Sequence, residues 1–226
     1  MIKVENISKS FGSKKVLNEL SVNLQKGKIY GIVGENGAGK TTFFRCLAGL
    51  ENYDGTIHSE YNPLKNVMGL LPTNPVFMSK ITGWEYLKLI SVARNNDFSN
   101  FEEKNIFDLD LNQYVENYST GMKKKLALLG VLLQNNKVFV LDEPFNGVDI
   151  HSNLIISEII QKLKSLNKIV LISSHIFSIL SETCDEIHVL ENGVFAKRVI
   201  KEDFHLLDKE MKDFAVGNRI DKLDLN

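Results

Sequence analysis

The sequence predicts an α/β fold with a largely parallel β-sheet, and three observations support this class. A glycine-rich stretch at 34–42 stands between a short apolar segment and a segment with helical spacing. Two later apolar segments, 138–141 and 168–173, each end in polar residues that can carry chemistry. A helical pattern separates these two segments, and strands that alternate with helices build parallel sheets.

The stretch 34–42 matches the phosphate-binding pattern G-x-x-x-x-G-K-[ST] at every position. Residues 28–33 before it predict a buried strand, and helical spacing after it relates Phe43, Phe44, Leu47 and Leu50. Glycines let backbone N–H groups point at phosphate oxygens, and a helix N-terminus adds partial positive charge. A turn that binds nothing is disfavoured, because pattern and context agree. We expect the whole loop to bind nucleotide: Gly34, Glu35, Asn36, Gly37, Ala38, Gly39, Lys40, Thr41 and Thr42.

Two side chains of this loop have specific expected tasks. Lys40 is expected to reach the β- and γ-phosphates. The hydroxyl of Thr41 is expected to bind Mg²⁺.

Length, composition and charge exclude several classes of function. The 226 residues can hold one large α/β domain, and 43% hydrophobic with 24% charged residues is ordinary for a globular chain. A net charge of −1 gives no overall basic field, so we expect no nucleic-acid partner. The two cysteines predict neither a disulfide framework nor a metal cluster and suit a reducing compartment. The N-terminus predicts no signal peptide and no apolar run is long enough to span a membrane, so a membrane role would need a partner chain.

Residues 1–33 predict β-strands, because apolar and polar residues alternate around 2–7 and 20–24. Turn signals stand at 12–13 and 26–27. Phe11, just before the first turn, has two possible roles. Spacing alone favours a turn residue that folds back onto the core, and the alternative is an aromatic plate for a nucleotide base with Val16 beside it.

The middle of the chain predicts a hairpin signal at Asp54–Gly55, a strand at 67–71 and then mostly helices. Residues 82–85 match a capping box, and a second, weaker helix is predicted near 101–107. Ser119 is a favourable N-cap for a helix that carries Leu126, Leu129 and Leu133.

Lys123, Lys124 and Lys125 lie at the start of that last helix. Such a run is usually a solvated face. Cations in the first turn oppose the helix dipole, and a nearby bound anion would remove that conflict.

The last third predicts a strand at 138–141, a helix with Ile155, Ile159 and Leu163, and a strand at 168–173. Asn192–Gly193 predicts a hairpin between strands at 186–190 and 194–199. A helix at 202–209 is expected in the polar tail.

Two strand ends carry the candidate catalytic residues. Ligands of open parallel sheets lie beyond the carboxyl ends of the strands, so Asp142 is expected to face the phosphate loop and hold Mg²⁺. Glu143 could polarise an attacking water as general base, and the alternative is a pair of surface acids. His175 ends the next strand; a lone histidine is more often structural, but this position favours contact with a γ-phosphate.

The order and spacing of these motifs resemble an ATP-binding cassette (ABC) ATPase over residues 1–200. The shared motifs are the phosphate loop, Tyr118-Ser119-Thr120-Gly121-Met122, the strand with Asp142-Glu143-Pro144, Gly147-Val148-Asp149 and Ser173-Ser174-His175. The pentad is similar to the Tyr-Ser-x-Gly-Met form common in bacterial exporter-type cassettes. The resemblance implies a P-loop RecA-like core, an N-terminal antiparallel β subdomain and an inserted helical subdomain at about 74–134, within a domain at 1–210 followed by a tail at 211–226.

The resemblance also implies roles for single residues. Phe11 would stack on adenine, and His175 would be the switch histidine. Ser119 and Gly121 would contact the γ-phosphate of ATP bound to a second subunit, and Asp149 would lie at the dimer seam.

One departure from the family concerns metal binding. The family has a glutamine after the strand at 67–71 that helps to hold Mg²⁺ and couples the site to the membrane partner, and this chain has Thr73 with Asn74 beside it. Thr73 is shorter and cannot span the same gap, although a water can bridge it. Thr73 is kept as a candidate on the metal side of the site.

The expected function is Mg²⁺-dependent ATP binding and hydrolysis at the interface of two copies. The expected partners are ATP, a second ATPase subunit and separate transmembrane permease subunits. The chain is then expected to be cytoplasmic and peripheral on the inner face of the membrane. The alternatives are an ABC ATPase of a soluble assembly complex and a regulatory nucleotide-binding module without turnover.

Overall fold

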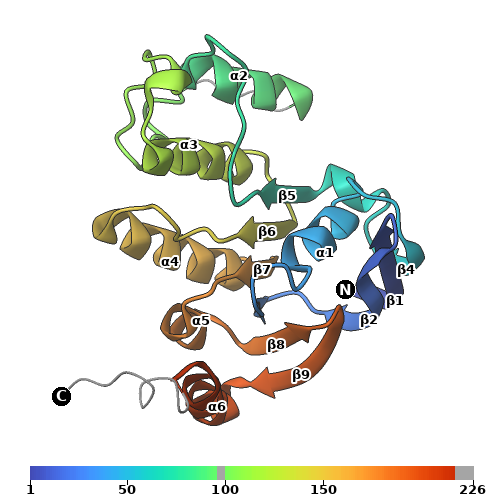
Figure 1. Cartoon of the computed structure of the whole chain (residues 1–226). Helices are drawn as coiled ribbons and strands as arrows, with labels where there is room; N and C mark the ends of the chain where they lie inside the picture. Colours follow the sequence, from blue (N-terminus) through green and yellow to red (C-terminus); the bar gives the residue numbers. More distant parts are fainter. Residues whose placement is uncertain (96–99, 217–226) are drawn as a thin grey trace, which may run out of the picture.

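A six-stranded sheet forms the centre of this computed structural model, which describes residues 1–95 and 100–216 (Figure 1). The strand order is β5-β6-β7-β3-β8-β9. Five strands are parallel, and β9 pairs antiparallel with β8 across the expected hairpin. The bounds are β3 (Lys28–Val33), β5 (Met68–Leu71), β6 (Val138–Asp142), β7 (Ile169–Ser173), β8 (Glu186–Glu191) and β9 (Val194–Ile200). Continuous burial of β6 and β7 explains their unbroken apolar runs, since both faces of a parallel sheet are covered.

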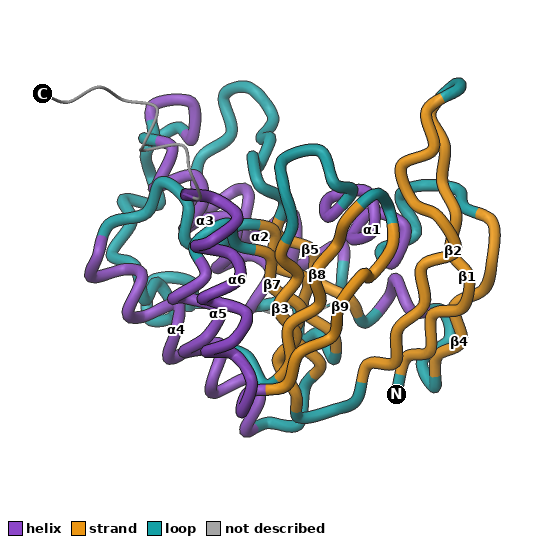
Figure 2. Tube along the Cα trace, turned by 60° about the horizontal axis from the view of Figure 1, so that its bottom comes forward, coloured by secondary structure: helices purple, strands orange, loops and turns teal. Residues whose placement is uncertain are grey.

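A second, antiparallel sheet of order β2-β1-β4 packs over one face (Figure 2). It consists of β1 (Ile2–Phe11), β2 (Lys14–Leu24) and β4 (Asp54–Ser59). The helix α1 (Lys40–Leu47) contacts both sheets. This is the predicted N-terminal β subdomain.

Two local predictions in this region are wrong. Asp54–Gly55 is no hairpin turn but the start of β4, and a Cβ on Gly55 would lie 2.5 Å from the carbonyl oxygen of Asn6. The glycine permits close strand approach. Leu50 is outside α1 and exposed, because Gly49 (φ +70°) ends the helix in the left-handed conformation.

Helices cover the other face of the large sheet (Figure 2). They are α3 (Thr120–Leu132), α4 (Ile150–Ser165), α5 (Phe177–Thr183) and α6 (Phe204–Val216), while α2 (Gly83–Ala93) packs on α3. Short 3₁₀ turns lie at Leu64–Asn66, Val115–Asn117 and Lys201–Asp203. The predicted caps are confirmed: Thr82 and Glu85 form the capping box of α2, and Ser119 accepts the N–H of Met122 at the start of α3.

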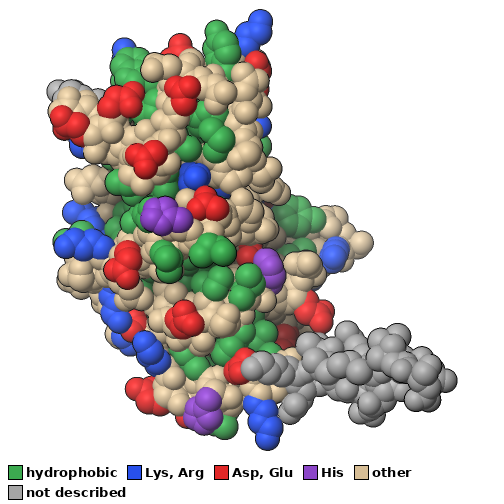
Figure 3. Space-filling model, turned by 90° about the vertical axis from the view of Figure 1, so that its left-hand side faces the viewer, with side chains coloured by type: hydrophobic (Ala, Val, Ile, Leu, Met, Phe, Trp, Pro, Cys, Tyr) green, Lys and Arg blue, Asp and Glu red, His purple; other side chains and the backbone are tan. Residues whose placement is uncertain are grey.

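The helices α2 and α3 form the inserted helical subdomain between β5 and β6, at one end of the molecule (Figure 1). Hydrophobic side chains reach the surface at this end, between acidic ones (Figure 3). Exposed large apolar residues of the described insert are Val76, Met78, Trp84, Leu89, Val92, Ile106 and Tyr114. The described helices include none that is long and apolar enough to cross a membrane.

The predicted helix at 101–107 is absent, and this prediction is wrong. Phe101 and Phe107 are buried, but turns connect them. The side chain of Asn105 donates to the carbonyl of Leu109 at 2.7 Å and accepts its N–H at 3.2 Å. An asparagine that bonds to nearby backbone competes with helix formation.

The helix predicted at 202–209 begins later and ends later than expected. A 3₁₀ turn precedes α6, and α6 then runs past residue 210, where the sequence placed the end of the domain. Phe204 and Leu207 anchor its first turns in the core. Residues 217–226 of the expected tail lie outside the described part of the chain.

Candidate nucleotide-binding site

An open pocket of about 420 Å³ lies at the carboxyl ends of β3 and β6, beside the hairpin between β1 and β2. Its position agrees with the rule that ligands of open α/β sheets bind beyond the strand ends. Most of the predicted nucleotide ligands line it. The lining consists of Phe11, Lys14, Val16, Asn36, Gly37, Gly39, Lys40, Thr41, Thr42, Thr73, Asp142 and Glu143.

The phosphate loop needs glycine where the chain packs or turns tightly. A Cβ on Gly34 would lie 2.4 Å from the carbonyl oxygen of Leu190, so no larger residue fits. Gly39 has φ +111° and is the N-cap of α1. The loop thereby directs the amino end of α1 toward the pocket, and such an end attracts anions.

The ammonium group of Lys40 lies inside the loop. It donates to the carbonyl oxygens of Gly34 at 2.6 Å and Glu35 at 3.1 Å, and the residue is buried. These two residues and Ala38 support the loop rather than line the pocket. A cation held by loop carbonyls beside the amino end of α1 makes the pocket a site for phosphates.

Three hydroxyl groups converge on the buried carboxylate of Asp142. Thr41 and Thr73 donate to its Oδ2 at 2.6 and 2.7 Å, and Ser173 donates to its Oδ1 at 2.5 Å. The donors come from α1, from the segment after β5 and from β7. Register explains the third contact, since Asp142 pairs with Ser173 across β6 and β7. The hydroxyl of Thr73, although its side chain is short, contacts Asp142 directly.

Glu143 lies next to Asp142 in a backbone conformation that is rare for its type. Its φ is +52°, in the left-handed region, and non-glycine residues there often belong to functional sites. Its N–H donates to the Ser173 hydroxyl at 2.9 Å, and its Oε2 is 2.9 Å from Nδ1 of His175. Glu143 and His175 are thus paired beside the pocket.

Phe11 does not fold back onto the core, so the interpretation that spacing favoured is wrong. Its side chain is 48% exposed and lines the pocket together with Val16. The ammonium group of Lys9 lies 4.9 Å from the ring centroid. An exposed ring at the rim fits the alternative, a plate for a base.

The residues that the sequence assigned to a second subunit's ATP or to the dimer seam do not line this pocket. Ser119 and Gly121 are at the start of α3, and neither lines it. Asp149 caps α4 by accepting the N–H and the hydroxyl of Ser152 at 2.9 and 2.8 Å, and it pairs with Lys125 at 3.2 Å. The bonds from Ser152 hold the pKa of Asp149 well below its ordinary value.

Three residues of the site region were missed. Lys14 lines the pocket and pairs with Phe11 across the β1–β2 turn. Its positive charge, which suits a site for phosphates, is the signal that could have identified it. Ser173 is the last residue of β7. Ligands bind beyond strand ends, so the argument that selected His175 also selects Ser173. The solvated-face interpretation is wrong for Lys124, whose side chain is buried against backbone carbonyls.

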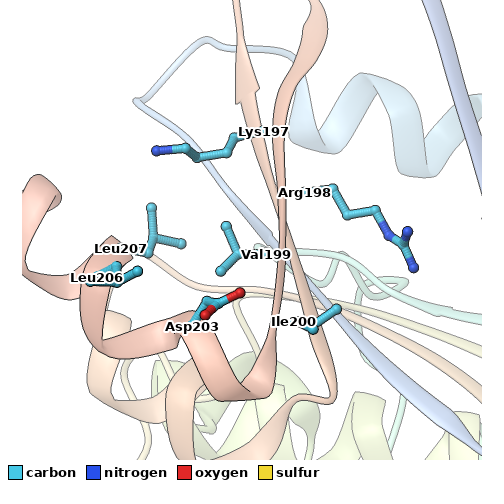
Figure 4. A pocket seen from close by; sticks show the side chains of 7 residues that line it. All are labelled: Lys197, Arg198, Val199, Ile200, Asp203, Leu206 and Leu207. Carbon is cyan, nitrogen blue, oxygen red and sulfur yellow. The ribbon is translucent and has the colours of Figure 1, made fainter.

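A second pocket, of about 460 Å³, lies between β9 and α6 (Figure 4). Lys197 and Arg198 point to opposite sides of the strand. Lys197 forms an ion pair with Glu210, and Arg198 donates to Glu186 at 2.7 Å. Both cations are thereby engaged within the fold, and the pocket lies apart from the phosphate loop.

Fold and pocket together define a P-loop nucleotide-binding protein. A family model described as "ABC transporter" matches residues 17–146. The chain belongs to this ABC transporter family, as an ATP-binding subunit. Membership favours the transporter role over the two alternatives.

Two relatives agree with this assignment. The chain is 29% identical to the bacitracin transport ATP-binding protein BcrA of Enterococcus faecalis, over 96% of this chain and 75% of the relative. It is 30% identical to the lantibiotic transport ATP-binding protein SrtF of Streptococcus pyogenes, over 85% and 88%.

Two solved structures share the fold. The ATP-binding subunit of an ABC transporter superposes with a TM-score of 0.82 at 24% identity, covering 98% of this chain and 97% of that one. A dimeric cassette with bound ADP and Pi in a post-hydrolysis state superposes with a TM-score of 0.80 at 18% identity, covering 89% and 99%.

The role of Lys40 can be tested by Lys40→Ala. We expect ATP affinity to fall by about 10- to 100-fold, since a hydrogen bond from a charged group contributes about 1.5–3 kcal/mol. Calorimetric titration with ATP measures the change. Lys65→Ala, in an exposed 3₁₀ turn away from the pocket lining, is the matched control. Equal affinity of both variants for ATP would refute the assignment.

Proposed function

We propose that this chain binds Mg²⁺·ATP in the pocket, hydrolyses it between two copies of the cassette, and powers a transporter whose membrane-spanning chains are separate. The convergence of Thr41, Thr73 and Ser173 on Asp142, beside Lys40 and Glu143, carries the proposal. A buried carboxylate with oriented oxygen ligands next to a phosphate cradle is the arrangement that Mg²⁺-dependent phosphoryl chemistry needs.

The oxygen atoms around Asp142 fit Mg²⁺. This ion prefers oxygen ligands and commonly takes one or two carboxylates plus substrate phosphates rather than an all-protein cage. The described residues contain no cluster of three or more metal-ligating His, Cys, Asp or Glu side chains. Thr41 and Asp142 would hold the ion, with Thr73 orienting Asp142. Bound Mg²⁺ neutralises charge on the β- and γ-phosphates.

Glu143 and His175 are the proposed catalytic pair. The carboxylate of Glu143 lines the pocket beside Asp142, where it can accept a proton from an attacking water. His175 contacts that carboxylate through Nδ1 and, just after the end of the neighbouring strand β7, can approach the γ-phosphate. Phe11 and Val16 would contact the adenine, and the loop 34–42 would hold the phosphates.

A second copy would complete the site. Ser119 caps α3 and is exposed at a helix N-terminus, which attracts anions, yet it lies outside its own pocket. We infer that Ser119 and Gly121 contact the γ-phosphate of ATP held by the partner cassette. Asp149 and the exposed Ile150 then lie at the seam.

The membrane partner is proposed to dock on the helical subdomain. Val76 is 91% and Met78 67% exposed in the segment that leads into α2, and apolar patches of this kind mark interaction sites. The chain would then be peripheral on the cytoplasmic face. BcrA and SrtF differ in their named cargo at nearly equal identity to this chain, which supports placing cargo choice in the permease. We propose residues 1–210 as the ABC ATPase domain.

Glu143→Gln tests the base. A general base contributes roughly 10²–10⁴ in rate, so hydrolysis should fall by about that factor. ATP affinity should remain, because Lys40, Thr41 and Asp142 are intact. Measurements of phosphate release and ATP binding separate the two effects, and normal turnover of the variant would exclude Glu143 as the base.

The same variant tests the dimer. ATP shared by two copies stabilises the dimer by linkage, and an enzyme that cannot hydrolyse ATP accumulates it. Gel filtration of Glu143→Gln should show a dimer with Mg²⁺·ATP but not with ADP. Adding Ser119→Arg should restore the monomer while ATP stays bound. A dimer that survives Ser119→Arg would place the contact elsewhere.

Thr73→Val tests the orientation of Asp142. The change keeps the side-chain shape but removes the hydroxyl. Loss of a group that orients a metal ligand typically costs about 10- to 100-fold in metal affinity. We expect the Mg²⁺ concentration for half-maximal ATPase activity to rise by about tenfold. Thr73→Ser keeps the donor and serves as control, and an unchanged Mg²⁺ requirement in Thr73→Val would contradict the role.

The docking surface can be tested with Val76→Glu combined with Met78→Glu. Two charges on an apolar interface should abolish co-purification of a polytopic membrane protein from source-cell membranes. Leu206→Glu, an exposed leucine on α6 at the opposite end of the molecule, is the control (Figure 1). Retention of the membrane protein by the double variant would show that it binds elsewhere.

A further inference from the structure

Lys124 is a buried cation in the helical subdomain. It lies five residues after Ser119, in the first turns of α3, and its relative exposure is 1%. Its neighbours in the lysine run differ: Lys123 donates to an exposed carbonyl of Glu116, and Lys125 pairs with Asp149. Burial of an ammonium group is costly unless it is hydrogen-bonded, so the contacts of Lys124 define its role.

The Lys124 ammonium group joins two segments of the nucleotide pocket. It donates to the carbonyl oxygens of Pro72 at 3.4 Å and of Thr73, in the segment after β5. It also donates to the carbonyl oxygen of Glu143 at 3.1 Å, after β6. One side chain of α3 therefore holds the backbone of both segments.

These two segments carry the groups that surround the reacting phosphate. The hydroxyl of Thr73 orients Asp142, and the carboxylate of Glu143 is the proposed base. Glu143 adopts its strained left-handed conformation among three backbone contacts: its N–H donates to the Ser173 hydroxyl, and its carbonyl accepts from Lys124 and from the N–H of Asn146 at 3.2 Å. Strained backbone persists only where its surroundings hold it. Lys124 supplies one of these three contacts, and it is the one that comes from the helical subdomain.

The electrostatics agree with a hydrogen-bonding rather than an ion-pairing role. Burial lowers the pKa of Lys124, and the nearby charges of Asp142 and Glu143 oppose that shift. Either protonation state of the amine keeps N–H donors for the carbonyl oxygens. The positive end of the α3 dipole does not stabilise the ammonium group of Lys124, so the carbonyl oxygens are the groups that stabilise it.

We propose that Lys124 is a positioning residue that links the start of α3 to Thr73 and Glu143. The inference rests on the proposed function, in which Ser119 and Gly121 meet the partner's γ-phosphate. When that phosphate binds at the start of α3, Lys124 transmits the resulting shift of α3 to the backbone of Glu143 and of Thr73. The helical subdomain thereby acts in hydrolysis as well as in docking.

Lys124→Met tests the proposal, because it keeps length and removes the donors. We expect kcat to fall by about 10- to 100-fold, since small misplacement of a catalytic group costs this much, while ATP affinity stays within twofold. Lys123→Met, one residue earlier, should retain wild-type kcat. Wild-type kcat in Lys124→Met, or ATP affinity lost in proportion to kcat, would overturn the inference.

A double-mutant cycle separates positioning from general stability. If Lys124 acts through the base, Lys124→Met should lower the rate of Glu143→Gln only slightly, because coupled residues are not additive. A purely structural role predicts that the two losses multiply. Independent effects of the two substitutions on the rate would therefore contradict the proposal.

Amide hydrogen exchange tests the link without relying on Glu143 as base. Lys124→Met should accelerate exchange at 73–76 and 143–147 and leave β3 and β7 protected. If Glu143→Gln alone turns over ATP normally, Glu143 is not the base. The exchange pattern of Lys124→Met still tests whether Lys124 holds the two segments. If Lys124→Met fails to fold, Lys124→Gln keeps a shorter donor and should give an intermediate kcat. Unchanged exchange at both segments would overturn the link.

Discussion

The hydrogen bonding of Asp142 is the interaction on which the nucleotide pocket depends. A buried carboxylate is costly unless donors surround it, and here three hydroxyl groups do so. These donors belong to α1, to the segment after β5 and to β7, which are distant in sequence. Satisfying one charge therefore fixes the phosphate loop, the segment after β5 and the end of β7 relative to one another.

The parallel register makes this convergence possible. Asp142 lies opposite Ser173, and Ser173 in turn lies opposite Ile32, next to the phosphate loop. Parallel strands in matched register have their carboxyl ends at one edge of the sheet, where polar groups can meet without interrupting the apolar interior. The strained conformation of Glu143 occurs at this edge, directly after the last residue of β6, and the Ser173 hydroxyl helps to hold it.

Sequence patterns predicted well the elements whose local and tertiary preferences agree. The strand and helix that flank residues 34–42, the buried strands, the capping box at Thr82 and the N-cap at Ser119 are all specified by neighbouring residues, and the structure confirms them. The failures occur where tertiary contacts decide. Gly55 signals a turn but serves a close strand approach, and residues 101–107 bury two aromatic rings without a helix because Asn105 bonds to the backbone.

The sequence by itself determined the family, the order of the motifs and the residue types that the chemistry requires. Lys40, Asp142 and Glu143 follow from pattern and position alone, since a phosphate loop and strand-end acids are local signals. Only the tertiary structure decided which groups meet: the hydroxyl of Thr73 on Asp142, the exposed ring of Phe11 at the rim, and Lys124 on two distant carbonyls. Such contacts join residues tens of positions apart, and their geometry depends on strand register and helix packing, which no local pattern encodes.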